Sequence, residues 1–198
     1  MNPVDSATMT LHLGRHAMNY RTFGRTGWKV SEIGYGMWGL AGWSGSDDQE
    51  TLASLHRAIE LGCNFFDTAW AYGDGKSEQI LATILRESKS KQGIGGPDQH
   101  LYVATKIPPK NRRWPSRRDF TLDDSYPPDY IDEYVGKSLK NLGVDSIDLM
   151  QFHTWEDRWL NDERLPRAIE NMRVDAMLRF DSAHGPQTTP ANESRSWP

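Results

Sequence analysis

Short apolar runs alternate along the chain with segments in which apolar residues recur every three or four positions. Runs of about five apolar residues are typical of buried parallel strands, and the wider spacing is typical of helices with one apolar face. The expected strands are 33–38, 63–67, 101–106 and 147–153, with a shorter candidate at 177–180, and the expected helices lie at 46–62, 80–85, 131–142 and 163–173. This alternation predicts right-handed βαβ units, a parallel sheet and the α/β fold class.

Turn and capping residues set the limits of several elements. Residues 20–31 alternate around a turn that contains glycine, which predicts a β-hairpin ahead of the sheet. The segment from Ser46 to Gln49 fits a capping box at the start of the first helix. Gly62 and Gly143 follow the first and third helices, as C-terminal caps do.

Both ends of the chain differ from this pattern. Residues 1–17 show no sustained periodicity and are expected to form a flexible leader. Residues 181–198 contain Pro, Ser, Thr and Gly and no aliphatic residue larger than alanine, which predicts a disordered tail. One domain is therefore expected, at 18–180.

Composition narrows the class of protein. The 198 residues, of which 37% are hydrophobic and 25% charged, are enough for one substantial core. The formal net charge of −4 gives no general attraction to nucleic acid or to anionic lipid. The single cysteine, Cys63, indicates a reducing compartment, and no apolar stretch has the length of a membrane span or signal peptide. The expected location is the cytoplasm, without membrane or nucleic-acid partners.

Polar residues stand where the expected strands end. Asp67, Lys106 and His153 end the second, third and fourth strands, and Tyr72 follows five positions after Asp67. The ends of parallel strands lie on one edge of a sheet, so these four groups are expected to converge. Taken singly, each has a simpler interpretation, because an aspartate can cap a helix, a lysine can lie on the surface and a histidine can be a hydrogen-bonded core residue.

Together the four groups fit acid–base chemistry. A tyrosine hydroxyl ordinarily titrates near ~10 and is a weak proton donor at neutral pH. An ammonium group within hydrogen-bond reach favours the phenolate, and a carboxylate can hold that ammonium in place. Tyr72 therefore fits a general acid that Lys106 and Asp67 adjust, with His153 orienting a substrate oxygen. No serine or cysteine nucleophile and no zinc-like ligand spacing accompanies them, so no metal site is expected.

These motifs resemble those of the aldo-keto reductase family. The resemblance rests on Phe66 to Gly73 with Glu78 following, on Ala104 to Lys106, on Asp148 to His153 and on the hairpin segment from Tyr20. It covers about 20–173, and it implies a (β/α)8 TIM barrel that reduces aldehydes or ketones with NADPH. The resemblance also implies that Tyr72 is the proton donor, that Lys106 and Asp67 tune it and that His153 positions the substrate.

The same resemblance implies a cofactor, NADP(H), that supplies the hydride. Met37 and Trp38 at the end of the first strand, together with Asp67, are the expected contacts of the cofactor. One competing pattern exists, because Gly34 to Gly39 fits the glycine fingerprint of Rossmann folds. That fingerprint requires a helix that opens within the glycines, whereas the helix expected here begins near Ser46.

The chain is shorter than a complete barrel, which needs eight strands and typically ~250 residues. The sequence supplies four βα units and a remnant of a fifth, so the expected fold is the N-terminal half of a (β/α)8 barrel, truncated after about the fourth unit. An open half-barrel leaves unpaired edges and an uncovered apolar face, which favour self-association. Two functions stay open, an aldo-keto reductase and a catalytically inactive half-barrel that acts only as an interaction module.

Two further patterns concern the loops after the strands. Every such loop carries tryptophan, which predicts an aromatic-lined pocket for a hydrophobic or ring-bearing carbonyl compound, although tryptophan can also simply pack a loop. The tryptophans are Trp38, Trp43, Trp70, Trp114, Trp155 and Trp159. The loop after the third strand is rich in Lys and Arg, which favours a solvated lid over a nucleic-acid contact in this acidic chain. Alternation that turns Lys106 and His153 inward also turns Gln151 inward.

Overall fold

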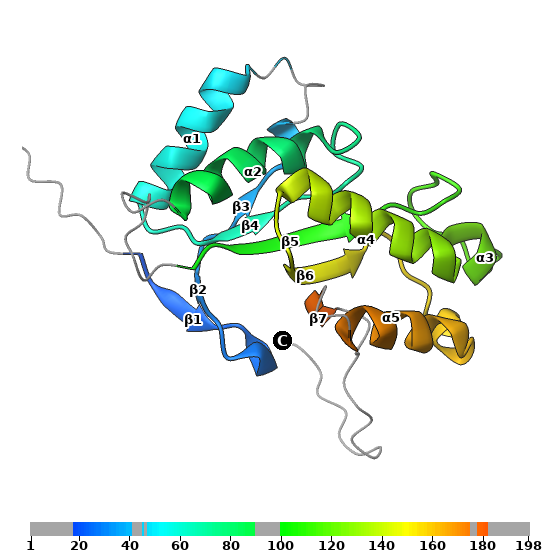
Figure 1. Cartoon of the computed structure of the whole chain (residues 1–198). Coiled ribbons are helices and arrows are strands. Elements are labelled where there is room, and N and C mark those ends of the chain that lie inside the picture. The colour runs from blue at the N-terminus through cyan, green and yellow to red at the C-terminus, as the bar shows by residue number, and fades with distance from the viewer. Residues whose placement is uncertain (1–17, 41–44, 46, 90–99, 175–177, 182–198) are drawn as a thin grey trace, which may run out of the picture.

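The computed structural model describes residues 18–40, 45, 47–89, 100–174 and 178–181. They form an open five-stranded parallel sheet with helices along it, and a separate two-stranded hairpin (Figure 1). The sheet runs in chain order, β3 (Tyr35–Gly36), β4 (Phe65–Asp67), β5 (Tyr102–Ile107), β6 (Ile147–Phe152) and β7 (Leu178–Asp181). The predicted parallel α/β architecture is confirmed.

Helices connect the successive strands. They are α1 (Asp48–Glu60), α2 (Lys76–Ser88), the short α3 (Leu122–Ser125), α4 (Pro128–Leu142) and α5 (Arg164–Val174). Helix α1 packs on α2, α2 on α4 and α4 on α5, so the helices follow the sheet in chain order (Figure 1). Aliphatic side chains of α2 and α4 are buried as their spacing predicts, including Leu81, Ile84, Ile131 and Leu142.

The two faces of the sheet carry different side chains. Successive residues of a strand point to opposite faces. Thr105 of β5 bonds to a residue of α2 and so lies on the outer face, which the helices cover. Lys106 therefore lies on the inner face, with its register partner Gln151 of β6.

The predicted hairpin is confirmed, with β1 (Tyr20–Thr22) antiparallel to β2 (Lys29–Ser31). Its aromatic rings cover the inner face where β4 and β5 begin. Phe23 lies 5.3 Å from Phe65, and Trp28 stacks 4.9 Å from Tyr102, measured between ring centroids. Asn64 fixes this position, because its Oδ1 accepts from the Ser31 amide at 2.7 Å and its Nδ2 donates to a carbonyl of β2 at 2.9 Å.

Several boundaries differ from those expected. Asp47 caps α1, since its Oδ1 accepts from the amides of Gln49 and Glu50 at 2.8 and 3.1 Å, so the predicted cap at Ser46 was wrong by one position. Strand β7 extends to Asp181, one residue past the expected domain end. The expected leader, 1–17, and the remainder of the expected tail, 182–198, lie outside the described residues.

The structure also bears on the Rossmann alternative, on membrane-spanning helices and on metal ligands. The glycines at 34–39 lead into a 3₁₀ turn, Trp38–Leu40, and α1 begins only at Asp48, so the Rossmann arrangement is excluded. Among the described residues, no helix has the length and apolar character needed to cross a membrane. The same residues contain no group of three or more His, Cys, Asp or Glu side chains able to hold a metal ion.

Candidate active site

A lysine–aspartate pair lies at the end of two neighbouring strands. Lys106 Nζ of β5 donates to Asp67 Oδ1 of β4 at 2.5 Å and to the Thr68 carbonyl at 2.8 Å. The side chain of Lys106 is 15% exposed and that of Asp67 is 39% exposed. The ammonium is therefore held within the sheet rim while the carboxylate remains open to solvent.

Tyr72 stands above this pair on the turn that links β4 to α2. Its amide donates to the Ala69 carbonyl at 3.0 Å, which closes the turn. Lys106 Nζ lies 5.2 Å from the centroid of the Tyr72 ring, and the His153 ring meets the Tyr72 ring edge-on at 5.7 Å. The structure thus brings all four sequence-predicted groups together in one cluster.

His153 follows β6 and is fixed by its backbone, whose amide donates to the Ile107 carbonyl at 3.0 Å. Burial and, to a smaller extent, the Lys106 ammonium lower the pKa of His153 to about 4, although Asp67 acts in the opposite direction. The imidazole is therefore neutral at pH 7. Its Nδ1 is buried and has no hydrogen-bond partner within the described part of the chain. A neutral ring with a free nitrogen can bond to an oxygen of a bound molecule.

Gln151 is a further polar residue on this face. It stands beside Lys106 in the β5–β6 register, and its Oε1 is buried without a partner among the residues that the structure describes. Buried polar atoms are nearly always hydrogen-bonded. The strand alternation already predicted that Gln151 points inward, but no sequence pattern indicated a role for it.

The residues expected to contact a cofactor have unequal access. Trp38, in the turn after β3, is 62% exposed. Met37 is fully buried, and its amide donates to the Asp67 carbonyl at 2.9 Å. Trp38 and Asp67 therefore present side chains at the rim, whereas Met37 supports the backbone beneath Asp67.

The tryptophans of the loops divide into two groups. Trp114 lies at the cluster, edge-on to His153 at 5.5 Å and 44% exposed. Trp70 and Trp159 instead pack structural elements, since Trp70 meets Tyr134 of α4 at 4.8 Å and the 2% exposed Trp159 meets Tyr126 at 5.4 Å. Trp155 packs on Trp159, and Trp43 lies outside the described residues.

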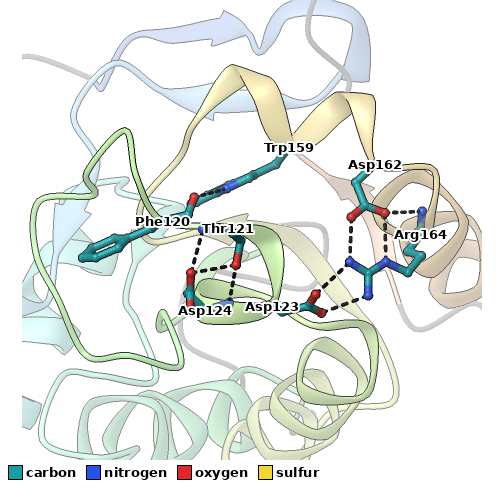
Figure 2. Close-up of polar contacts among 7 residues, drawn as sticks. All are labelled: Phe120, Thr121, Asp123, Asp124, Trp159, Asp162 and Arg164. Carbon is teal, nitrogen blue, oxygen red and sulfur yellow. Dashed lines mark hydrogen bonds and ion pairs between the residues drawn. The ribbon is translucent and has the colours of Figure 1, made fainter.

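The loop that carries Trp114 is tied to the loop before α5 (Figure 2). Trp159 Nε1 donates to the Phe120 carbonyl at 3.0 Å, and Arg164 bridges two carboxylates, Asp123 at 2.9 and 3.0 Å and Asp162 at 2.7 Å. The short helix α3 begins with a capping box between Thr121 and Asp124. Sequence reasoning missed this helix, although the spacing of Thr121 and Asp124 is a capping signal that could have revealed it.

The comparison with protein families decides the affiliation. The model of the "Aldo/keto reductase family" matches residues 32–175, which is most of the chain. The chain belongs to this family. Aldo-keto reductase YhdN of Bacillus subtilis is 34% identical over 164 residues, 82% of this chain and 45% of that protein. Aldo-keto reductase yakc [NADP(+)] of Schizosaccharomyces pombe is 32% identical over 125 residues, 63% of this chain and 34% of that protein.

A solved member of the aldo-keto reductase family shows the same architecture. The holo form of aldo-keto reductase AKR11C1 from Bacillus halodurans superposes with a TM-score of 0.61 at 25% identity, over 83% of this chain and 49% of that one. Relatives of this kind indicate the (β/α)8 fold and oxidoreductase activity for the family. The chain spans less than half the length of the two curated relatives described above.

Proposed function

We propose that this chain contributes the acid–base site of an NADPH-dependent aldo-keto reductase that reduces an aldehyde or ketone to an alcohol. The observation that carries the proposal is the cluster in which Lys106 reaches Asp67 at 2.5 Å while the rings of Tyr72 and His153 adjoin it. In this proposal Tyr72 donates the proton to the carbonyl oxygen. Lys106, which Asp67 holds in place, stabilises the anionic form of Tyr72, and neutral His153 orients the same oxygen.

Cofactor binding is supported in part by the residues present. Trp38 presents an accessible side chain in the turn after β3, and Asp67 presents one beside Lys106. Gln151 Oε1, which has no partner among the described residues, lies on the same face as Lys106. NADPH, when bound, supplies the hydride that the carbonyl carbon accepts. The choice of NADP(H) rests on the family resemblance and on the cofactor named for the Schizosaccharomyces pombe relative, aldo-keto reductase yakc [NADP(+)].

The proposed substrate is a small carbonyl compound with an apolar or aromatic part. Trp114 carries this choice, because its partly exposed ring stands against His153, where a substrate side group would lie. The expected cytoplasmic location fits the single cysteine, which is buried and free.

A fluorescence titration with NADPH tests the proposal. The chain has eight tryptophans, of which Trp38 is exposed at the proposed cofactor edge, so binding should quench emission. Tyr72→Phe should then abolish reduction while it leaves cofactor affinity nearly intact. Tyr35→Phe is the matched control, since the Tyr35 hydroxyl bonds only to Ser54 of α1 among the contacts described, outside the cluster. Absence of quenching at millimolar NADPH, or unchanged turnover of Tyr72→Phe, would refute the assignment.

A second candidate is a catalytically inactive half-barrel that serves as an interaction module. It is favoured by the open sheet, in which β3 and β7 are edge strands of the described part. Such edges favour pairing with a second copy. Analytical ultracentrifugation with and without NADPH separates the candidates, because an interaction module self-associates without responding to the cofactor.

A further inference from the structure

The first turn of α2 contacts both strands that carry the lysine–aspartate pair. Ser77 and Glu78 are successive residues of this turn, and both are 0% exposed. They reach the outer face of the sheet, opposite the face from which Lys106 projects. Each of them bonds to a threonine that is next in sequence to a member of the pair.

Ser77 makes the connection to β4. Its Oγ lies 2.8 Å from Oγ1 of Thr68, the residue that follows Asp67, and donates to the Met37 carbonyl at 3.4 Å. The carbonyl of Thr68 accepts from Lys106 Nζ at 2.8 Å, so a shift of Thr68 moves an acceptor of the ammonium. The backbone amide of Ser77 also donates to the Tyr72 carbonyl at 3.2 Å, which ties the turn of Tyr72 to the same point.

Glu78 makes the connection to β5. Its Oε1 accepts from Oγ1 of Thr105 at 2.6 Å, and its Oε2 accepts from Nδ2 of Asn141 on α4 at 2.8 Å. Thr105 precedes Lys106 and is 0% exposed. Burial raises the pKa of Glu78, and the bonds from Thr105 and Asn141 oppose that shift. A buried carboxylate at this position costs stability unless it is well hydrogen-bonded. If Glu78 served only to fill the space between α2 and the sheet, an apolar side chain would do so equally well.

We propose that Ser77 and Glu78 are positioning residues that set the distance between Asp67 and Lys106 from the opposite face of the sheet, acting through Thr68 and Thr105. The importance of that distance for catalysis rests on the function proposed above. The geometry itself does not, because the hydrogen bonds of Ser77 and Glu78 join residues of this chain to one another. Loss of one bond should therefore loosen the hold on the Lys106 ammonium while the fold remains.

The reactivity of Lys106 toward acetic anhydride reports this hold directly. The full chain is labelled with a limiting amount of reagent, and acetylation of each lysine is read by mass spectrometry of peptides. Lys29 and Lys137 of the same molecules serve as internal references. The variants are Thr105→Val, which keeps the side-chain volume and removes the hydroxyl, and Thr105→Ser, which restores a donor. Thr51→Val is the matched control, a threonine 3% exposed on α1.

We expect Thr105→Val to raise Lys106 labelling severalfold relative to the reference lysines, and Thr105→Ser and Thr51→Val to leave it at the wild-type level. Ser77→Ala carries the same test from the β4 side, should Thr105→Val fail to fold. Unchanged Lys106 labelling in a folded variant would overturn the proposal. An equal rise at all lysines would do so too, because it would show general loosening. Neither result depends on NADPH binding or turnover, so failure here is distinct from failure of the proposed function.

Discussion

Polar side chains on the outer face of the sheet are buried and hydrogen-bonded, whereas several on the inner face are exposed or lack hydrogen-bond partners within the described residues. On the outer face, Thr105 and Glu78 are 0% exposed and bonded to each other. On the inner face, Asp67 is 39% exposed at its side chain, and the buried Gln151 Oε1 and His153 Nδ1 lack partners within the described residues. Satisfied polar groups rigidify a site, whereas unsatisfied ones are available to a bound molecule. The outer face is therefore suited to holding geometry and the inner face to chemistry.

The largest expected effect is the loss of catalytic activity when a residue of the inner face is replaced. Lys106→Met removes the ammonium beside Tyr72 and should lower the rate of carbonyl reduction by about 10²–10⁴-fold, as loss of acid–base assistance typically does. Lys29→Met is the control, since Lys29 lies in the hairpin and bonds to Thr22 at 2.8 Å. Steady-state kinetics with NADPH measure both. If Lys106→Met turned over substrate at the wild-type rate, the assignment of the chemistry to the inner face would be contradicted.

Replacing a residue of the outer face should instead lower the stability of the fold. Glu78→Ala leaves the buried Thr105 hydroxyl and the half-buried Asn141 amide without their acceptor, which should lower the free energy of unfolding by about 3 kcal/mol. Gln79→Ala, next along α2 and exposed, should change it by no more than about 0.5 kcal/mol. Urea unfolding followed by circular dichroism compares the two, and equal midpoints would contradict the bonding role of Glu78.

The approach of α2 to α4 gives a smaller stability effect. Gly75 has φ +94°, and a Cβ atom there would lie 2.4 Å from Asn141 Nδ2. Gly75→Ala should cost about 1–2 kcal/mol, because it adds left-handed strain and displaces the amide that bonds to Glu78. Gly136→Ala on α4 meets nothing within 4 Å and should stabilise the helix by up to about 1 kcal/mol. Thermal unfolding should show shifts of opposite sign, and shifts of the same sign would be inconsistent with this packing.

The smallest effect distinguishes the faces by pH. The raised pKa of Glu78 contributes stability that is present below its ordinary value of 4.5 and is lost as pH rises through the raised value. The lowered pKa of His153 contributes stability that is present above 6.5 and is lost as pH falls toward about 4. Between pH 7 and pH 5, wild type should therefore gain stability relative to Glu78→Gln and lose it relative to His153→Gln.

Urea unfolding of the three proteins at pH 7 and at pH 5 measures these differences. Gln79→Glu is a suitable control, because a carboxyl at that exposed position should titrate without a burial effect. Differences of the same sign for Glu78→Gln and His153→Gln would show that the two faces do not respond oppositely to protonation.

The sequence predicted the inner face better than the outer one. Asp67, Lys106 and His153 were identifiable because each ends an apolar run, and parallel strands bring such ends together. Glu78 was visible only as part of a family motif, since its partners Thr105 and Asn141 are 27 and 63 residues away. Bonds across such separations depend on how helices pack, which local patterns do not encode.

Local sequence signals gave wrong predictions in two situations. In one, two adjacent residues could both cap a helix, and in the other, tertiary packing determined whether a side chain is buried. Ser46 and Asp47 are both good capping residues, and the choice of Asp47 follows from the backbone rather than from residue type. Trp159 resembled a pocket residue because it follows a strand, yet it is buried against Tyr126 and donates to Phe120. The rings on the hairpin, Phe23 and Trp28, likewise gave no sign of which strands they would cover.

The seat of the hairpin has a practical consequence for handling the protein. Asn64 and Gly62 fasten the hairpin where β4 begins, and Tyr20 Oη donates to the Gly62 carbonyl at 2.8 Å. Tyr72 and Lys106 lie where the strands end, at the opposite edge of the sheet. If the protein is immobilised on a sensor surface through an affinity tag fused ahead of Met18, the edge of the sheet that carries Tyr72 and Lys106 should therefore face the solution and stay accessible to nucleotides.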